Sequence, residues 1–444
     1  MLKYALTGNP LGHSLSAIIH NEILLCKNIK GNYELKPTDN LDKSFREELS
    51  KINGFNVTIP YKKDILNYLD VKSDKVKLYN SCNTVKIKDG KAAGYNTDVY
   101  GILDTLKKNS VDVKGKKVLI SGCGGVSSMM ACEMVLLGAD VYLTARNREK
   151  AEELILDIFN KTGKKIKFIK KEEAKEFYLY MQGTPVGMYP KLEKSYLPLS
   201  KLKNISVVFD TIYNPYKTLA VRVCEYYGNK GIGGLNMLVE QAVKAQEIFN
   251  GITLTKQEFN KVLNKAKGNI PSFKIEKNII LIGPPGCGKS AISREISSLL
   301  NMDIFDVDLE IVKREKKSIN EIFEKYGEEY FRKVEKEIFI ESLSKTGQII
   351  ATGGGLPLYN NLETLNEEEN TVVYLNVDKD VIFERISKDN SRPLLKNDKK
   401  NSLFELIKKR QPIYEKSAHI KINVEKERNI KDTVVEVLEK IFCK

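Results

Sequence analysis

Cysteine, histidine and long apolar runs are all scarce in this chain. Its 7 cysteines are scattered and no two form a Cys-x-x-Cys pair, which disfavours a disulfide or zinc framework and favours reduced thiols. With only 3 histidines, a His₂-carboxylate metal site has no support. No apolar stretch reaches the roughly 18 residues that span a bilayer, and the opening "MLKYALTGNP" reads as a strand and a turn, not as a secretory signal. We therefore expect a cytoplasmic protein without a membrane partner.

The net charge of +14 raises the question of a nucleic-acid partner. The lysines are spread among glutamates, however, and no basic tract is interleaved with aromatic residues. We expect small anionic molecules as binding partners and no nucleic acid. The composition does not indicate an oligomeric state.

Alternating strand-like and helix-like patterns run along the whole chain and predict an α/β fold. The length of 444 residues favours two or three domains, and 42% hydrophobic residues suffice for packed cores. One break, "KAKGNIPSFKIEKN", follows a helix-like run over 256–267 and is rich in breaker residues. We place a linker at 268–276. The two halves carry different glycine loops, which indicates a fusion and not a duplication.

The segment "GPPGCGKS" in the second half fits G-x-x-x-x-G-K-[ST] at every fixed position. It follows an apolar run over 279–282 and precedes a helix-like run over 291–300, which is the context that a phosphate-binding loop needs. In such loops backbone amides surround the phosphates, the lysine neutralises their oxygens and the hydroxyl reaches Mg²⁺. The residues expected to bind ATP with Mg²⁺ are Gly283, Gly286, Gly288, Lys289 and Ser290.

The segment "KKVLISGCGGVSSMM" in the first half reads as a strand, a glycine turn and a helix. Gly122 and Gly124 allow a pyrophosphate to approach the helix N-terminus, although Ser127 stands at the third glycine position. The next strand, "DVYLTARNR", offers Arg146 and Arg148 where an NAD site usually has an acidic residue. Arginines suit a 2′-phosphate, so this pattern favours NADP(H).

Polar clusters also follow strand-like runs in "GNPLGHSLSAIIHN", "GFNVTIPYK", "NSCNTV" and "GYNTDVYG". Open α/β sheets bind their ligands at such strand ends. Lys62 and Asp98 are the most informative pair, because a lysine beside a carboxylate can deliver a proton to an oxygen that gains charge. The residues that could meet a polyhydroxylated substrate are Ser14, Ser16, Thr58, Asn83 and Asp98.

Together these segments resemble shikimate dehydrogenase over residues 1 to about 267, and the resemblance continues through "GTPVGM", "DTIYNPYKT" and "GGLNMLVEQA". It implies a substrate-binding domain over 1–100, completed by helices at about 235–267, and a Rossmann NADP-binding domain over 101–234. It makes Lys62 and Asp98 catalytic. The implied substrate residues are Ser14, Ser16, Thr58, Asn83, Tyr213 and Gln241. The implied NADP residues are Gly122, Gly124, Gly125 and Arg146, to which we add Arg148 and Gly234.

Three residues depart from the pattern of this family. Ala17 stands where proline is usual, Ala145 where asparagine precedes the arginine, and Gln182 where asparagine precedes the Thr-Pro. The first change should be tolerated. The second removes one donor from the expected 2′-phosphate site.

Three segments of the second half indicate which hydroxyl would accept a phosphoryl group. "IFDVDLEI" ends a strand with Asp306 and Asp308, which we expect on one face, one near the metal and the other near the acceptor. "YGEEYFRKVEKE" places Arg332 and Glu335 three residues apart on one helical face. "IIATGGGLP" ends a buried strand with three glycines, so that backbone can close around a small ligand.

Two later segments complete the pattern: "NSRPLLKNDKK" reads as a lid that carries Arg392, and "KKRQPIYEKSA" places Arg410 on a late helix. The order and spacing resemble shikimate kinase over 277–444, a P-loop domain with a parallel five-stranded sheet. Ala291 departs from the threonine that is common after the Lys-Ser. The resemblance assigns shikimate to Asp308, Arg332, Gly354 and Arg410, the Mg²⁺ environment to Ser290 and Asp306, and the transferring phosphoryl group to Arg392. We add Lys289 of the phosphate-binding loop to the catalytic residues.

The two resemblances predict a bifunctional enzyme of aromatic amino acid biosynthesis. NADPH would reduce 3-dehydroshikimate, with Lys62 protonating the oxygen and Asp98 orienting the lysine and the substrate. ATP would then phosphorylate the 3-hydroxyl of shikimate, which Asp308 positions or deprotonates. One alternative is a quinate-accepting, NAD-linked dehydrogenase joined to a kinase of another small alcohol. A second alternative is a degenerate P-loop domain that acts as a nucleotide switch.

Overall fold

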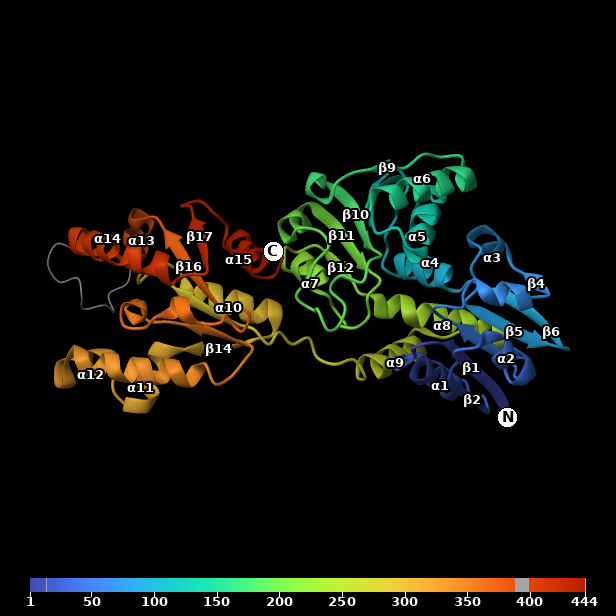
Figure 1. The fold of residues 1–444 in the computed structure, drawn as a ribbon, viewed down its shortest axis with the longest axis horizontal. Helices are drawn as coiled ribbons and strands as arrows, with labels where there is room; N and C mark the ends of the chain where they lie inside the picture. Colours follow the sequence, from blue (N-terminus) through green and yellow to red (C-terminus); the bar gives the residue numbers. More distant parts are fainter. Residues whose placement is uncertain (13, 388–398, 444) are drawn as a thin grey trace. The chain divides into compact units, whose positions relative to one another are not determined.

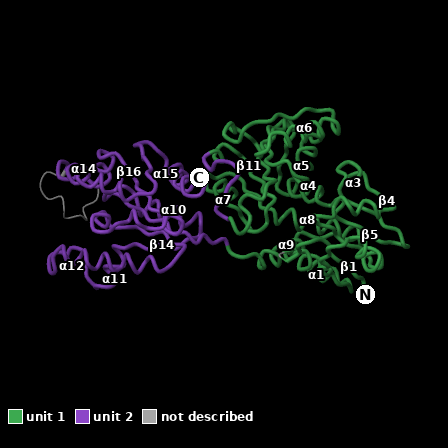
Figure 2. Tube along the Cα trace, viewed as in Figure 1, with its two compact units in different colours: residues 1–191, 201–272 green, residues 192–200, 273–444 purple. Residues whose placement is uncertain are grey.

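The computed structural model of this chain describes residues 1–12, 14–387 and 399–443 (Figure 1). The chain divides into two compact units, Met1–Lys191 with Lys201–Ser272 and Leu192–Ser200 with Phe273–Lys444 (Figure 2). The short segment 192–200 belongs to the second unit, although the residues on both sides of it belong to the first.

The N-terminal part of the first unit is a six-stranded mixed sheet with the order β2-β1-β3-β5-β6-β4. Strands β1, β2 and β3 are parallel, whereas β5 runs antiparallel to β3 and β6. The buried runs in β1 and β3 explain why these strands lie inside the sheet. The bounds are β1 (Leu2–Gly8), β2 (Gly31–Pro37), β3 (Gly54–Val57), β4 (Val71–Lys72), β5 (Thr84–Lys88) and β6 (Lys91–Tyr95).

Helices from both ends of the first unit pack beside this sheet. The apolar faces of α1, α8 and α9 share one buried cluster, and a Thr255–Glu258 capping box fixes the start of α9. Ala245 and Phe249 of α8 lie in a second buried cluster with Tyr4 and Leu6 of β1, so α8 packs on this sheet although it is far from it in sequence. The helix bounds here are α1 (Ser16–Cys26), α2 (Leu41–Glu47), α3 (Asp74–Tyr79), α4 (Asp98–Lys108), α8 (Gly234–Asn250) and α9 (Lys256–Lys267).

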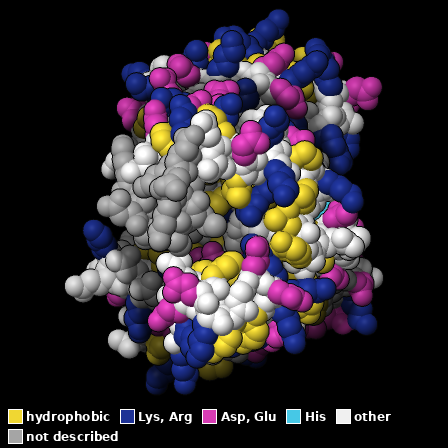
Figure 3. Space-filling model, turned by 90° about the vertical axis from the view of Figure 1, so that its left-hand side faces the viewer, with side chains coloured by type: hydrophobic (Ala, Val, Ile, Leu, Met, Phe, Trp, Pro, Cys, Tyr) yellow, Lys and Arg dark blue, Asp and Glu magenta, His cyan; other side chains and the backbone are white. Residues whose placement is uncertain are grey.

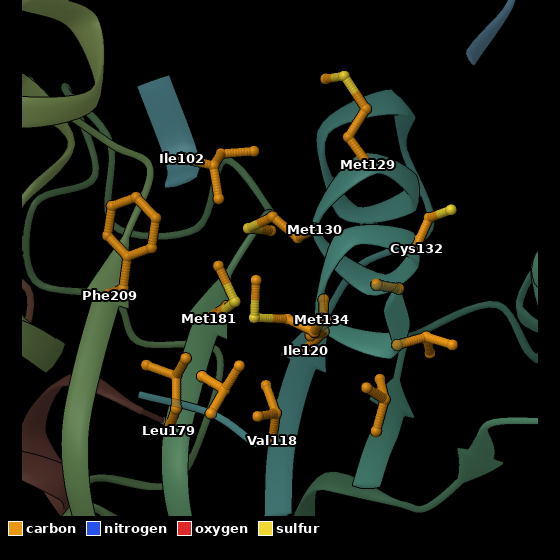
Figure 4. Close-up of a cluster of buried hydrophobic side chains, with 14 of the residues drawn as sticks. Ile102, Val118, Ile120, Met129, Met130, Cys132, Met134, Leu179, Met181 and Phe209 are labelled. Atoms are coloured by element: carbon orange, nitrogen blue, oxygen red, sulfur yellow. The ribbon is translucent and has the colours of Figure 1, made fainter. Parts of the chain in front are cut away.

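The second sheet of the first unit is parallel and has the order β12-β11-β10-β7-β8-β9, as in a Rossmann fold. Met130 and Met134 of α5 point toward Met181 of β10 in a fully buried core (Figure 4). Flexible methionines fill the space between helix and sheet. The bounds are β7 (Lys117–Ser121), α5 (Gly125–Leu136), β8 (Asp140–Thr144), α6 (Arg148–Thr162), β9 (Lys167–Phe168), β10 (Phe177–Gln182), β11 (Ile205–Asp210), α7 (Leu219–Tyr226) and β12 (Lys230–Ile232).

The second unit is built on a parallel five-stranded sheet with the order β14-β15-β13-β16-β17, so the predicted fold class is confirmed. Its central strand reads NIILI and is buried throughout, as a sheet covered on both faces requires. The bounds are β13 (Asn278–Ile282), α10 (Lys289–Leu300), β14 (Asp303–Asp306), α11 (Val307–Glu315), α12 (Ile319–Ser342), β15 (Gln348–Ala351), β16 (Asn370–Val377), α13 (Lys379–Ser387), α14 (Lys399–Ser417), β17 (Ile420–Val424) and α15 (Ile430–Phe442).

Candidate active sites

Lys62 and Asp98 form an ion pair in the first unit. Lys62 Nζ donates to Asp98 Oδ2 at 2.6 Å. Asp98 is the first residue of α4, where a carboxylate is favoured by the helix dipole. Lys62 lies in the loop after β3, and its carbonyl accepts the Cys82 amide at 2.8 Å. The two elements therefore hold both members of the predicted acid–base pair in contact.

Asn83 and Gln241 lie in the same hydrogen-bonded group. Asn83 Nδ2 donates to Asp98 Oδ1 at 2.9 Å, and Asn83 Oδ1 accepts the Thr97 amide at 2.7 Å. The Thr97 hydroxyl donates to Gln241 Oε1 at 3.3 Å, which joins α8 to the group. All of these side chains except Lys62 are buried, so the carboxylate of Asp98 is fixed on one side and faces the lysine on the other.

The remaining predicted substrate residues come from three other segments. Ser14 Oγ donates to Ser16 Oγ at 3.1 Å at the start of α1. Thr58 comes directly after β3 and lies against the end of β1. A Cβ on Gly8, whose φ is +156°, would lie 2.4 Å from the Thr58 methyl group. Tyr213 follows β11 and packs on the cluster shared by α1, α8 and α9. Burial raises the pKa of its phenol, which keeps it a hydrogen-bond donor.

The glycine turn between β7 and α5 is open enough for a bound phosphate. Gly122 has a φ of +92°, and Gly124, the N-cap of α5, provides no capping side chain. A Cβ on Gly124 or Gly125 would meet no heavy atom within 4 Å. Exposed amides at a helix N-terminus fit a pyrophosphate. Ser127, at the third glycine position, donates to the carbonyls of Ser121 and Gly183 at 3.1 and 3.3 Å and so ties α5 to the sheet.

The two arginines after β8 differ in their surroundings. Arg148 Nε donates to Glu152 at 2.9 Å, and its guanidinium lies 5.3 Å from the centre of the Phe168 ring. Arg146 is exposed, and the described residues offer it no ion pair. Gly234 has a close-packing role, because a Cβ there would lie 2.2 Å from the Thr211 carbonyl oxygen.

Two buried polar residues hold the loops that follow β10 and β11. Gln182, a departure from the family pattern, accepts the hydroxyls of Ser121 and Thr184 at 2.6 and 2.9 Å and donates to the Val186 carbonyl. Asp210 accepts the Thr218 hydroxyl at 2.7 Å and the Ile212 amide at 3.0 Å. Burial raises the pKa of Asp210 to about 7. These contacts hold the loop that carries Tyr213.

In the second unit the predicted phosphate loop joins β13 to α10. Gly283, Gly286 and Gly288 all have positive φ angles of 147°, 80° and 102°. Lys289 Nζ donates to the Gly283 and Pro284 carbonyls at 2.8 and 3.2 Å. The Ser290 residue is exposed in the first turn of α10, which leaves its hydroxyl accessible to a cation.

Asp306 and Asp308 do not share one strand, and this part of the interpretation was wrong. Strand β14 ends at Asp306, whose carboxylate accepts the Leu309 amide at 3.2 Å and caps α11. Asp308 therefore lies in the first turn of the helix. Its Oδ1 atom lies 2.9 Å from the position that a Cβ on Gly353 would take.

The three glycines after β15 make room for the side chains around them. A Cβ on Gly353 would also lie 2.5 Å from Glu335 Oε1, and a Cβ on Gly355 would lie 2.4 Å from Arg332 Nη1. Arg332 Nη1 donates to Glu335 Oε2 at 2.7 Å. The predicted glycine turn is thus a place where two carboxylates and a guanidinium converge.

Arg410 joins the same place from α14. Its Nη1 donates to the Gly354 carbonyl at 3.0 Å, and the Tyr414 hydroxyl donates to that oxygen at 2.6 Å. Arg392, the remaining predicted residue, lies outside the described residues.

Basic and acidic side chains are interspersed on the face of the second unit that Figure 3 shows.

Comparisons with known proteins support the predicted family of each half of the chain. Residues 6–85 match the family model of the shikimate dehydrogenase substrate binding domain, and residues 285–442 match that of shikimate kinase. A shikimate dehydrogenase (NADP(+)) from Clostridium perfringens is 35% identical over 277 residues, which are 60% of this chain and 99% of that protein. One from Caldicellulosiruptor bescii is 38% identical over 281 residues, which are 61% of this chain and 96% of that protein.

The chain belongs to the shikimate dehydrogenase family. A crystal structure of a shikimate dehydrogenase in complex with NADP+ has 32% identity and a TM-score of 0.56, and the match covers 61% of this chain and 96% of that one. The part of the chain beyond this match carries the shikimate kinase domain. The two families were therefore predicted correctly from the sequence motifs.

Two side chains beside the predicted arginines of this dehydrogenase–kinase chain were not predicted from the sequence. Glu328 accepts from Arg332 Nη2 at 3.1 Å, and Tyr414 donates to Gly354. Each lies four residues from a predicted arginine, Arg332 or Arg410, and helical spacing could have identified both.

No helix in the described ranges is long and apolar enough to cross a membrane.

Proposed function

We propose that this chain catalyses two consecutive reactions: NADPH-dependent reduction of 3-dehydroshikimate to shikimate, and ATP-dependent phosphorylation of shikimate to shikimate 3-phosphate. The observation that carries the proposal is that several of the residues predicted for each reaction lie close together in their unit. Lys62 and Asp98 are paired in the first unit. Arg332, Asp308 and Arg410 surround the glycine turn in the second.

In the first unit, Lys62 would donate its proton to the carbonyl oxygen of the substrate. Asp98 holds the lysine and, through Asn83, is itself held in place. The contact of 2.6 Å between Lys62 Nζ and Asp98 holds the proposed donor at the site. Ser14, Ser16, Thr58, Tyr213 and Gln241 would bind the hydroxyl and carboxylate groups of the substrate.

The cofactor NADPH supplies a hydride when it is bound. The α5 N-terminus with Gly122, Gly124 and Gly125 would hold its pyrophosphate, because amides there lack capping partners. Arg146 would bind the 2′-phosphate, since its guanidinium is not paired within the described part of the chain. Arg148 already pairs with Glu152 and would add a weaker contribution. Gly234 would let α8 approach the cofactor site closely.

In the second unit, Asp308 would position or deprotonate the 3-hydroxyl of shikimate, while Arg332 and Arg410 bind its carboxylate. Lys289 would neutralise the phosphate oxygens, and Arg392 would stabilise the transferring phosphoryl group. Mg²⁺ bound with ATP supplies further charge neutralisation, and Ser290 and Asp306 would hold it. The Gly354 carbonyl, bound by Arg410 and Tyr414, fixes the wall of this site.

The partners that we propose are small molecules alone, and we place the enzyme in the cytoplasm because all seven cysteines are free.

The deciding experiment supplies the full chain with 3-dehydroshikimate, NADPH and MgATP and follows NADPH loss and ADP formation together. In Lys62→Ala both signals should fall, and added shikimate should restore ADP formation. In Lys289→Ala only ADP formation should fall. A wild-type chain that consumes NADPH but never forms ADP would contradict the kinase half.

A further inference from the structure

A chain of buried side chains leads away from the Lys62–Asp98 pair into the protein interior. The Tyr33 hydroxyl donates to Asn56 Oδ1 at 2.8 Å, and Asn56 Nδ2 donates to Thr84 Oγ1 at 2.9 Å. The Thr84 hydroxyl donates to Asn83 Oδ1 at 3.0 Å. Asn83 then donates to Asp98. Four strand or loop segments thus contribute to one line of contacts that ends at the carboxylate.

The side-chain amides of Asn83 and Asn56 each have only one orientation that satisfies their neighbours. The Thr97 backbone amide donates to Asn83 Oδ1 at 2.7 Å, so the Asn83 nitrogen must face Asp98. The Asn83 backbone carbonyl can only accept, and it lies 3.0 Å from Asn56 Nδ2. The Asn56 oxygen must therefore face Tyr33, whose hydroxyl donates. The orientations of both amides thus follow from groups that cannot reverse their role, while the Thr84 hydroxyl lies 3.0 Å from Asn83 Oδ1 and 3.0 Å from Thr97 Oγ1.

Burial restricts the motion of these hydrogen-bonded side chains. The exposed fractions of Tyr33, Thr84 and Asn56 are 1%, 0% and 5%. The His20 ring stacks on Tyr33 with centroids 4.0 Å apart and an angle of 6°. Burial raises the pKa of Tyr33 well above its ordinary range, so the phenol keeps its proton. Water cannot replace a lost partner at these positions, and a missing bond leaves a buried donor unsatisfied.

We propose that Tyr33, Asn56 and Thr84 are positioning residues for the reduction. They hold the Asn83 amide so that Asp98 keeps Lys62 Nζ at the carbonyl of the substrate. The inference rests on the proposed reductase function and adds residues that need not touch substrate or cofactor. Its physical basis is that a small displacement of an acid–base group lowers turnover strongly, whereas substrate affinity depends on other contacts.

The test compares Thr84→Val, Thr84→Ser and Tyr33→Phe in the full chain. Removing the hydroxyl in Thr84→Val should lower kcat of the reduction about tenfold, with KM for 3-dehydroshikimate changed less than about twofold. Thr84→Ser keeps the hydroxyl and should restore kcat to within about twofold of wild type. Tyr33→Phe should lower kcat by a smaller factor, since it removes the outermost bond of the chain.

Thr105→Val is the matched control. Thr105 is also a buried threonine, and it lies on α4 with Asp98, but its hydroxyl has no hydrogen-bond partner in the described ranges. Its loss should leave kcat unchanged. Urea unfolding of the full chain, followed by circular dichroism, reports whether the first unit of each variant is folded, and kinase turnover in the other unit measures only the amount of intact protein. If Thr84→Val does not fold, Thr84→Ser and Tyr33→Phe decide.

Three results would overturn the positioning role. One is unchanged kcat in Thr84→Val or, where that variant does not fold, in Tyr33→Phe. Another is equal losses in Thr84→Val and Thr84→Ser. A raised KM with kcat preserved would also overturn it and would mark a substrate contact instead. If the wild-type chain did not reduce 3-dehydroshikimate at all, the proposed function itself would fail, which is a different result from active wild type with unaffected variants.

Discussion

Arg332 and Glu335 form an ion pair of 2.7 Å across one turn of α12, in which the glutamate is the more deeply buried partner. The exposed side-chain fractions are 15% and 2%. The second carboxylate oxygen of Glu335 has no hydrogen-bond partner in the described part of the chain. Burial raises the pKa of Glu335, and the charge of Arg332 opposes this effect. The position of the Arg332 guanidinium therefore depends on a buried carboxylate whose hydrogen-bond partner in the described residues is this arginine.

Glu335→Gln should impair the kinase more than Glu328→Gln does. Glu335 is a buried, charge-assisted partner of Arg332, and losing such a contact typically costs about 1.5–3 kcal/mol. We expect kcat/KM for shikimate to fall by about 10-fold to 100-fold. Glu328 is 58% exposed and pairs with the same arginine at i, i+4, where an ion pair contributes about 0.3–0.5 kcal/mol. Its substitution should change kcat/KM by about threefold or less. Equal effects in steady-state kinetics would contradict this ranking.

Spacing along a single element predicted local contacts correctly. The three-residue interval between Arg332 and Glu335 does place them on one helical face, in contact. The P-loop glycines lie between a strand and a helix, as the motif requires. Such predictions succeed because they depend on local geometry alone.

The failures arise where an element ends or where distant segments meet. Asp306 and Asp308 were expected on one strand face, but Asp306 ends β14 and caps α11, a boundary that side-chain alternation does not reveal. Tyr33, Asn56 and Thr84 were not predicted, because their contacts depend on the pairing of β2, β1, β3 and β5. Sheet register is a tertiary property, and a one-residue shift would point each side chain to the opposite face.

Lys62→Ala should remove the proton donor of the reduction. We expect kcat to fall about 100-fold or more, with a smaller effect on KM for 3-dehydroshikimate, because the loss of a general acid acts mainly on the transition state. Kinase turnover of the same chain, measured with added shikimate, is the internal control. Reductase kcat close to that of wild type would exclude Lys62 from the mechanism.

Arg146→Ala should weaken the use of NADPH more than Arg148→Ala does. Arg146 is exposed without an ion pair in the described ranges, whereas Arg148 is held by Glu152 and by the Phe168 ring. We expect kcat/KM for NADPH to fall about tenfold or more in Arg146→Ala and about threefold in Arg148→Ala, in line with the loss of one charge-assisted contact. Values for NADH should stay nearly constant in both. A wild-type chain that prefers NADH would refute the assignment to NADP.

Asp210 should make the stability of the first unit depend on pH in an unusual direction. Its carboxyl is buried, and this burial raises its pKa to about 7 in the folded chain, compared with about 4 when unfolded. The folded state thus favours the protonated form. The contribution of this group to stability is complete below about pH 4, is lost as the pH rises toward 7, and stays constant above that value.

Asp210→Asn tests this dependence because it keeps the shape of the side chain and removes the charge. The free energy of unfolding of the variant, minus that of wild type, should rise between about pH 4 and 7 and then level off, by an amount of the order of a few kcal/mol. Urea unfolding monitored at several pH values measures this difference. Asp89→Asn, at the exposed turn between β5 and β6, should give a curve parallel to that of wild type. If the Asp210→Asn curve were also parallel to wild type, the carboxyl would already be ionised in the folded chain, and its contacts with the Thr218 hydroxyl and the Ile212 amide would outweigh the cost of burial.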